Sequence, residues 1–151
     1  MDLVISGLPV GFGEPWFEGI EPALARALMA IPAARAVEFG RGVNAGLMRG
    51  SKHNDKWGED MSLDEGADGA LGGMASGAPI HVRVTFKPPS GISKPQETFN
   101  QVTGMMEELA IKGRHDPVIA PRARPVVEAV ARLVIADLGI QGGYILSLIH
   151  I

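Results

Sequence analysis

The spacing of hydrophobic residues predicts a strand and then a helix at the start of the chain. Residues 1–6 are mostly apolar and predict a strand that begins at once, and the glycines and prolines of residues 7–15 predict a loop. Proline at position 22 falls inside the helical pattern that follows, so the helix either begins near Glu21 or kinks there. The apolar side chains that recur at three- and four-residue intervals are Phe17, Ile20, Leu24, Leu28 and Ile31.

Three further segments of the first two-thirds of the chain have a clear pattern. Residues 34–39 predict a strand that ends at a glycine, and residues 43–49 are its expected hairpin partner because a Gly-Arg-Gly turn separates them. Residues 51–69 are polar and predict a long surface loop, a feature that is often functional or disordered. The clearest strand covers residues 80–86, where apolar residues alternate with polar and cationic ones. Such alternation is typical of an antiparallel sheet with one buried face.

The last third of the chain holds one ambiguous segment and one helix. Residues 98–111 include a stretch with helical propensity, but the segment as a whole also suits an extended hairpin arm. A turn is expected at residues 113–117. Pro125 is expected to open a helix, in the first-turn position that proline favours, and Gly139 to cap it. The side chains expected to point inward are Val126, Val130, Leu133 and Val134.

Composition narrows the class of protein. The 151 residues suit a single domain, and a hydrophobic fraction of 46% argues against disorder. A net charge of −3 argues against a non-specific nucleic-acid binder. The absence of cysteine excludes disulfides and thiolate chemistry and fits a reducing compartment, so we expect a cytoplasmic protein. No apolar run reaches the roughly 18 residues that a membrane span needs.

Both ends of the chain are unusual. The first residues show no basic or long apolar leader, so no secretory signal is expected, and a chain that opens inside a strand is expected to be truncated. Residues 146–151 (Leu-Ser-Leu-Ile-His-Ile) resemble the translation of a sequencing adapter. We therefore expect residues 1–140 to be a portion of one domain and residues 141–151 to be a non-native tail, in which His150 has no chemical role.

Three polar clusters are candidate sites. Residues 114–117 place a cation, an imidazole and a carboxylate in one turn, which can bind an anion and move a proton. Residues 87–91 offer an ammonium group and a hydroxyl that can hold a phosphate or carboxylate. Residues 69–77 contain four glycines that allow a ligand close to the backbone. Taken singly, each is explained at least as well by an ordinary turn or strand end, and the histidines show no metal-ligand spacing.

In combination, the order of these segments resembles the chorismate synthase family. The most specific match is Lys112–Pro117 (Lys-Gly-Arg-His-Asp-Pro), followed by Arg122–Ala129 (Arg-Ala-Arg-Pro-Val-Val-Glu-Ala). The resemblance covers residues 2–138 in the right order. The other matching segments are the Gly-Pro loop at 7–17, a pair of family strands at 37–40 and 48–51, the glycine-rich stretch at 67–77 and the Lys-Pro loop at 86–92.

The resemblance implies a fold and a reaction. The fold is of the α/β (α+β) class, a sandwich of antiparallel sheets that enclose helices, of which this chain holds the C-terminal part only. The family assembles as a homotetramer, with no nucleic-acid or membrane partner, and in its fold residues 105–111 are extended. The reaction is the anti 1,4-elimination of phosphate from 5-enolpyruvylshikimate 3-phosphate to give chorismate, in the shikimate pathway.

Cofactor use and the limits of this chain are implied in the same way. Reduced FMN is required although the reaction is redox-neutral, and NADP is associated with the family. Whether a separate or an intrinsic reductase reduces the flavin stays open. The family's two catalytic histidines and its substrate-binding arginines lie in a part that this chain lacks, so the fragment alone is expected to be inactive.

Site residues follow from the matched motifs, position by position. Asp116 is implied to be an acid-base residue near the flavin, and Arg114 to lie beside both flavin and substrate, where a fixed cation favours anionic ligands. Gly72 is implied to let the backbone approach the flavin closely. The other implied flavin contacts are Lys87, Pro88, Pro89, Ser90 and Gly91, with Pro32 and Ala33 through their backbone.

Three positions depart from the family pattern. Pro89 stands where a small or hydroxylated residue is usual, and Gly91 stands where serine is common, so one hydroxyl contact to FMN is expected to be lost. Asp68 replaces a glycine and is expected to bring negative charge near a phosphate-bearing ligand, unless its loop faces away.

Two other interpretations stay open. One is a non-catalytic flavin- or anion-binding module derived from the same fold, which a genuine start at Met1 and measurable FMN binding would favour. The other is a truncated gene product with no independent existence, which the adapter-like tail favours.

Overall fold

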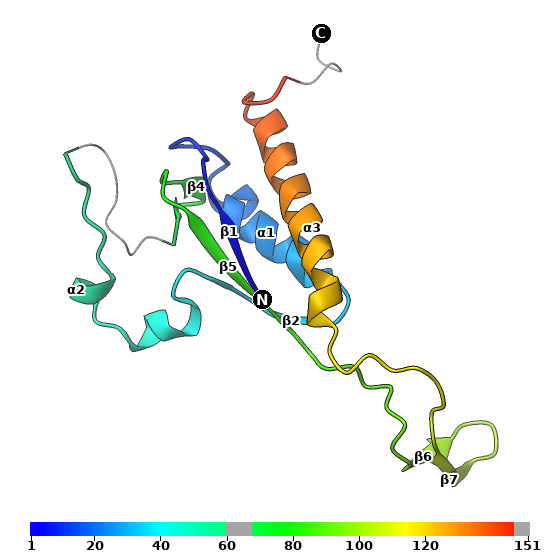
Figure 1. Cartoon of the computed structure of the whole chain (residues 1–151). Coiled ribbons are helices and arrows are strands. Elements are labelled where there is room, and N and C mark those ends of the chain that lie inside the picture. The colour runs from blue at the N-terminus through cyan, green and yellow to red at the C-terminus, as the bar shows by residue number, and fades with distance from the viewer. Residues whose placement is uncertain (60–67, 147–151) are drawn as a thin grey trace.

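A three-stranded antiparallel sheet with two helices on one face forms the body of the protein. In this computed structural model, which describes residues 1–59 and 68–146, the sheet order is β1 (Asp2–Ile5), β5 (Ile80–Phe86) and β2 (Ala34–Phe39). The helices are α1 (Ile20–Met29) and α3 (Ala120–Gln141), which pack against each other beside the sheet (Figure 1). The strands at 1–6, 34–39 and 80–86 are confirmed.

Shorter elements fill the connections between the main ones. The described residues form the 3-10 helices η1 (Trp16–Glu18) and η2 (Gly42–Leu47), the short helix α2 (Gly50–His53), and two hairpins made of β3 (Ala70–Leu71) with β4 (Met74–Ala75) and of β6 (Gln96–Asn100) with β7 (Met105–Leu109). The expected surface loop at 51–69 contains α2 at its start, and its residues 60–67 lie outside the described residues.

The core lies between the sheet and the helices. Along β5 the inward residues Ile80, Val82 and Val84 are buried while the residues between them are exposed, as the alternation predicts. Full burial of an aliphatic side chain contributes roughly 1.5–3 kcal/mol, so this face accounts for much of the attraction between the layers. The buried helix residues that meet it are Ile20, Ala23, Leu24 and Leu28 from α1 and Val127, Ala131 and Leu138 from α3.

The first helix begins at Ile20, so the proline at position 22 lies in its first turn and does not kink it. Its start is held by a close backbone contact. The Ile20 amide donates to the Gly73 carbonyl at 2.8 Å. A Cβ on Gly19 would lie 2.6 Å from the Cα of Gly73, so both positions require glycine.

The expected strand pairing after Gly40 is wrong. Residues 43–47 lie in η2, and the two residues that follow are extended but unpaired with β2. Residues 48–51, which were matched to a family strand, end in the first turn of α2. The partner of β2 is β5, with Val37 opposite Val84. The physical reason is that β5 offers a longer β-branched edge, whereas Gly40 and Gly42 both have positive φ and turn the chain away.

The expected bounds and inner face of the last helix are also wrong. The helix begins at Ala120, so Pro125 lies inside it and does not open it, and Gly139 is buried within it. Because the inner face runs through Ala123, Val127 and Ala131, two of the residues expected inside face solvent: Val126 is 45% exposed and Leu133 is 70% exposed. Val130 and Val134 are half-buried against the core. The helix runs past Gly139 because the glycine pair at 142–143, with Gly143 at positive φ, terminates it instead.

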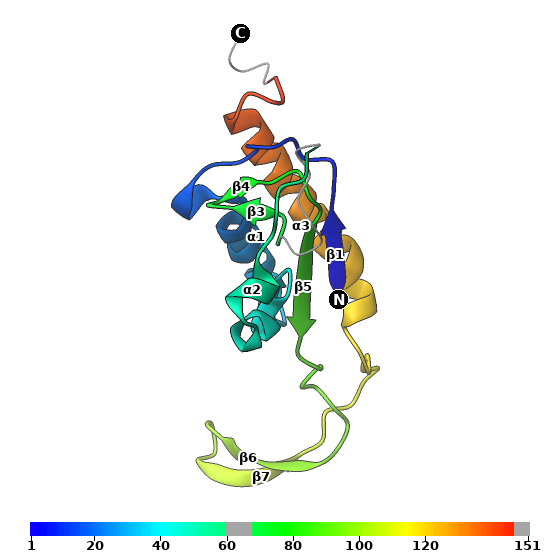
Figure 2. The ribbon, with the colours of Figure 1, turned by 90° about the vertical axis from the view of Figure 1, so that its left-hand side faces the viewer.

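The segment that was ambiguous in sequence is extended. Strands β6 and β7 pair with Gln96 opposite Leu109 and Asn100 opposite Met105, which confirms the expected hairpin. We call residues 96–109 the arm and the two connecting segments, 87–95 and 110–119, the neck. In both views the arm projects away from the sheet and helices (Figures 1 and 2).

Candidate functional site

The pairing of β2 with β5 brings two of the candidate segments together. Ala34 lies opposite Phe86, and the Lys87 amide donates to the Ala33 carbonyl at 2.9 Å. Ala33 has a φ of 71°, in the left-handed region, and follows Pro32 in a turn closed by a hydrogen bond from the Ala34 amide to the Ile31 carbonyl. An alanine held there stores about 1 kcal/mol or more of strain, which is a feature that clusters at binding sites.

The neck brings the other two candidate segments together. Residues 87–91 leave the end of β5, and residues 114–116 return toward α3. A Cβ built on Gly91 would lie 3.7 Å from Nδ1 of His115, so the two residues face each other across the neck with room for a small side chain between them. His115 is fixed further by a hydrogen bond between its Nε2 and the Ile111 carbonyl, at 3.2 Å.

Asp116 is held between two arginines. Its Oδ1 lies 3.4 Å from Arg114 and its Oδ2 lies 2.7 Å from Arg122, at the start of α3. The Asp116 side chain is 30% exposed while both guanidinium groups are mostly exposed, so the pairs orient the carboxylate more than they stabilise the fold. Sequence reasoning quoted Arg122 within a motif but gave it no role. The spacing could have indicated this pair, because Arg122 follows Asp116 by six residues and lies at the start of a helix.

The charge of this cluster suits an anionic ligand. Lys87, Arg114 and Arg122 are exposed cations near the neck, and Asp116 is the carboxylate among them. Ser90 is exposed and adds a hydroxyl, while Pro89 and Gly91 are half-buried and shape the loop. Cations and hydroxyls of this kind bind phosphate and carboxylate groups, so these residues fit a phosphate-bearing flavin.

Gly72 is not part of this cluster. It lies in the β3–β4 hairpin near the start of β5, whereas Lys87 follows the end of that strand, roughly 20 Å away at about 3.3 Å per residue. Gly72 has positive φ and open space around its Cα, and its carbonyl accepts a hydrogen bond from the Trp16 amide at 3.4 Å. Within the described residues, therefore, the predicted flavin contacts separate into two groups.

Asp68 faces the loop after β2 and not the neck. Its Oδ1 accepts a hydrogen bond from the Arg41 amide at 3.3 Å. Burial, with a smaller contribution from the Asp68 charge, raises the pKa of Glu21. The loop that carries Asp68 therefore faces away from the candidate phosphate-binding residues of the neck.

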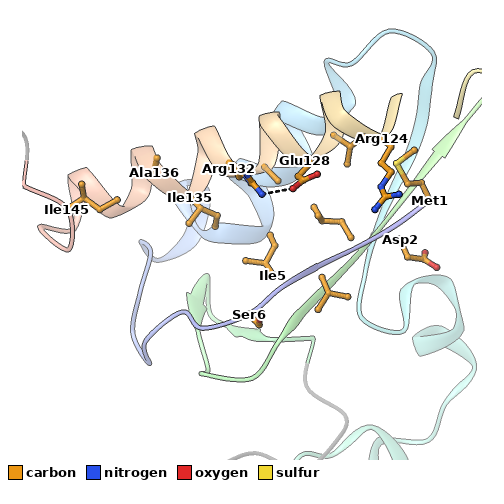
Figure 3. Close-up of a pocket in the computed structure, with 14 residues that line it drawn as sticks. Met1, Asp2, Ile5, Ser6, Arg124, Glu128, Arg132, Ile135, Ala136 and Ile145 are labelled. Atoms are coloured by element: carbon orange, nitrogen blue, oxygen red, sulfur yellow. Dashed lines mark hydrogen bonds and ion pairs between the residues drawn. The ribbon is translucent and has the colours of Figure 1, made fainter. Parts of the chain in front are cut away.

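A cavity lies elsewhere, between β1 and α3 (Figure 3). It encloses about 690 Å³ and is lined by apolar residues such as Leu3, Ile5 and Ile135, with Arg124 and an ion pair between Glu128 and Arg132 at its rim. None of the predicted site residues lines it. Among the described residues β1 pairs only with β5, so its other edge faces this groove.

Residues 1–59 and 68–146 lack the features of two other classes of site. No group of three histidine, aspartate or glutamate side chains is placed to hold a metal ion. No helix in this part of the chain is long and apolar enough to cross a membrane.

The order of these motifs is matched by known proteins. The family model for chorismate synthase matches residues 1–140. The chain belongs to the chorismate synthase family. A chorismate synthase of Methanosarcina mazei is 44% identical over 149 residues, which are 96% of this chain and 41% of that protein. One of Dehalococcoides mccartyi is 46% identical over 142 residues, 91% of this chain and 39% of that protein.

A solved structure agrees with the fold. A crystal structure of chorismate synthase superposes with a TM-score of 0.69 at 27% identity, and the match covers 93% of this chain and 37% of that one. This confirms the predicted α+β fold with antiparallel sheets. The chain spans about two-fifths of the length of the relatives it matches.

Proposed function

We propose that this chain carries part of the flavin and substrate site of a chorismate synthase. The complete enzyme would release phosphate from 5-enolpyruvylshikimate 3-phosphate by an anti 1,4-elimination and form chorismate. The observation that carries the proposal is the convergence at the neck, where Gly91 faces His115 and Asp116 lies between two arginines. Residues that are weak signals singly become one polar site there.

The cations of the neck are proposed to bind and orient the anionic ligands. Lys87 and Arg114 would neutralise phosphate oxygens, and the backbone around Ala33 would contact the flavin next to Lys87. The turn that holds Ala33 is fixed by strand pairing, so this contact would be preorganised. Reduced FMN held by these residues would supply the transient reducing chemistry that eases the departure of phosphate.

Asp116 is proposed to manage the proton. Loss of phosphate from the substrate is balanced by loss of the C6 proton, which a carboxylate in the site can accept. Arg122 and Arg114 hold the two oxygens of Asp116 in place, and the side chain remains partly exposed and so reachable. A positioned acid-base group typically contributes a factor of about 10²–10⁴ to the rate.

The isolated chain is proposed to be inactive. It spans about two-fifths of its relatives, so the residues that complete the site would come from the remaining part of such a protein. The homotetramer and the cytoplasmic location of the complete enzyme are proposals on the same basis. The absence of cysteine from the chain fits that location.

A hybrid enzyme tests the proposal. In the Methanosarcina mazei chorismate synthase, the matching segment is replaced by residues 1–140 of this chain. We expect the hybrid to form chorismate with reduced FMN, while the 151-residue chain alone forms none. Asp116→Asn in the hybrid should lower kcat at least a hundredfold.

Asp137→Asn is the matched control, because Asp137 is an exposed carboxylate on α3 bonded to Gln141. It should leave kcat unchanged. A folded hybrid that stays inactive but binds FMN would favour the non-catalytic binding module. Equal activity of the Asp116→Asn and Asp137→Asn hybrids would contradict the assigned role of Asp116.

A further inference from the structure

His115 turns one edge of its imidazole ring toward the loop at 87–91. Its Nε2 lies 3.2 Å from the carbonyl oxygen of Ile111, on its own side of the neck. A carbonyl oxygen only accepts hydrogen bonds, so Nε2 carries the proton that is donated. The edge formed by Nδ1 and Cε1 lies 3.7 Å and 3.9 Å from a Cβ built on Gly91. The hydrogen bond to Ile111 therefore fixes which edge of the ring faces the other side of the neck.

The Nδ1 atom is a hydrogen-bond acceptor in this arrangement. When Nε2 holds the proton of a neutral imidazole, Nδ1 carries a lone pair. Within residues 1–59 and 68–146, Nδ1 makes no hydrogen bond. Gly91 has no side chain to fill the space in front of this edge, and His115 is half-buried. A ligand held against residues 87–91 can therefore reach an acceptor on the opposite side of the neck.

The charged side chains of the neck cannot supply the same function. Lys87 and Arg114 only donate hydrogen bonds, so they suit the anionic oxygens of a ligand. Each oxygen of Asp116 already lies beside an arginine, Oδ1 at 3.4 Å from Arg114 and Oδ2 at 2.7 Å from Arg122. A ligand that carries hydroxyl or N–H groups as well as an anionic group also needs an acceptor for those donors.

The acceptor on His115 differs from the hydroxyl of Ser90, which can also accept. Ser90 is exposed, and a serine hydroxyl turns freely until a ligand orders it. The imidazole of His115 is instead held by its hydrogen bond to Ile111 before any ligand arrives. A group that is already oriented loses less conformational entropy on binding, so Nδ1 is the better placed acceptor of the two.

We propose that His115 is a specificity-determining residue of the neck, and that its Nδ1 accepts a hydrogen bond from a hydroxyl or ring N–H of the flavin. This inference rests on the proposed function, because it takes FMN as the ligand held against residues 87–91. The phosphate of FMN suits the cations of the neck, and its ribityl hydroxyls and ring N–H suit an acceptor. A bare anion uses the cations alone, so His115 favours the flavin over such an anion.

Two variants of His115 separate the roles of its two ring nitrogens. In His115→Gln the amide nitrogen lies near the place of Nε2 and keeps a donor for Ile111, but nothing replaces Nδ1. In His115→Asn the amide oxygen takes the place of Nδ1, and the donor to Ile111 is lost. Oxidised FMN is the probe, and isothermal titration into the hybrid enzyme without substrate measures its affinity.

The two variants should bind FMN differently. We expect His115→Gln to weaken FMN binding about fivefold, as the loss of one hydrogen bond implies, and His115→Asn to stay within about twofold of the unsubstituted hybrid. If His115 only held its turn in place, the Asn variant would weaken binding at least as much as the Gln variant. That order, or unchanged binding in His115→Gln, would overturn the proposal.

His81→Gln is the matched control. His81 is an exposed histidine near the start of β5, whereas the neck begins after the end of that strand. The same substitution there removes an imidazole without touching the proposed contact. It should leave the affinity for FMN unchanged.

A second measurement tests the acceptor without any flavin. Nitrogen-15 NMR of the full 151-residue chain shows which imidazole nitrogen carries the proton, and His115→Gln identifies the signals of His115 among the four histidines. At mildly alkaline pH we expect the proton of His115 on Nε2 and a lone pair on Nδ1. A proton on Nδ1, or one shared between the two nitrogens, would overturn the proposal.

The outcomes also separate this inference from the proposed function. A hybrid that forms chorismate and binds FMN equally well with and without His115→Gln would support the proposed function and overturn the role of His115. A hybrid that binds no FMN would overturn the proposed function, and the role of His115 with it.

Discussion

Gly91 and His115 face each other across the neck. The gap between them, 3.7 Å from a Cβ on Gly91 to Nδ1 of His115, leaves room for a small side chain without displacing the imidazole. The family resemblance expects serine where Gly91 stands. Position 91 therefore has room for a serine, whose hydroxyl this chain lacks.

We predict that Gly91→Ser increases the affinity of the hybrid enzyme for FMN about fivefold, the value of one hydrogen bond of about 1 kcal/mol. The free energy of unfolding should change by no more than about 0.5 kcal/mol, because the position is half-buried and its φ is not positive. Isothermal titration measures the affinity. Gly91→Ala, which adds the Cβ without the hydroxyl, should not increase the affinity for FMN. An equal increase in both variants would show that the hydroxyl is not the cause.

Two adjacent glycines should respond differently to the same substitution. A Cβ on Gly73 would lie 2.6 Å from the Glu14 carbonyl oxygen, whereas one on Gly72 meets nothing within 4 Å. Both have positive φ. We predict that Gly73→Ala destabilises the chain by about 3 kcal/mol or more and Gly72→Ala by about 1 kcal/mol. Urea unfolding followed by circular dichroism measures both, and similar losses would contradict the close packing of Gly73 on α1.

The inner face of α3 can be tested with neighbouring valines. Val127 is buried in the core and Val126 is exposed. Val127→Ala should cost about 2 kcal/mol of unfolding free energy, and Val126→Ala should change it by less than about 0.5 kcal/mol. Thermal melts of the two variants show which face of α3 packs into the core. The reverse order of losses would restore the inner face expected from sequence.

An exposed ion pair links β1 to β5 and sets a pH dependence. Arg83 Nε donates to Asp2 Oδ1 at 2.7 Å, and this hydrogen bond lowers the pKa of Asp2. Because the folded-state pKa is lowered, the stabilisation is present above the unfolded value of about 3.9 and is lost as the pH falls through the folded value. Asp2→Asn should therefore reduce stability at neutral pH and not in strong acid.

Carboxyl NMR titration measures that pKa directly. In Arg83→Gln the pKa of Asp2 should rise toward its ordinary value. Arg26→Gln, which removes a comparable exposed pair with Glu18, should leave it unchanged. A pKa of Asp2 that is the same in all three proteins would show that Arg83 does not bind it in solution.

Local patterns predict those parts of the fold in which burial and periodicity coincide. The alternation along β5 alone identifies its buried face, and the three- and four-residue spacing before Met29 identifies α1. The arm and α3 are harder to predict, because local propensity in each disagrees with the structure that forms. Residues 105–109 have helical propensity yet pair with β6, while Pro125 resembles a helix start yet lies inside one.

The candidate site, too, has a part that the sequence predicts and a part that only the structure shows. The motifs around Lys87 and Asp116 are visible in sequence, but each is equally compatible with a turn. The approach of Gly91 to His115 and the separation of Gly72 from the neck depend on the path of the chain in three dimensions, and the pairing of Asp116 with Arg122 depends on how the chain turns into α3.

The amino-acid sequence by itself determined the family, the class of fold and the central strand and helix, because these follow from motif order and from side-chain periodicity along the chain. Only the tertiary structure decided the partner of β2, the phase of α3 and the grouping of the polar residues. The physical reason is that strand pairing and helix packing join residues far apart in sequence, and the free energy of those contacts overrides weak local preferences.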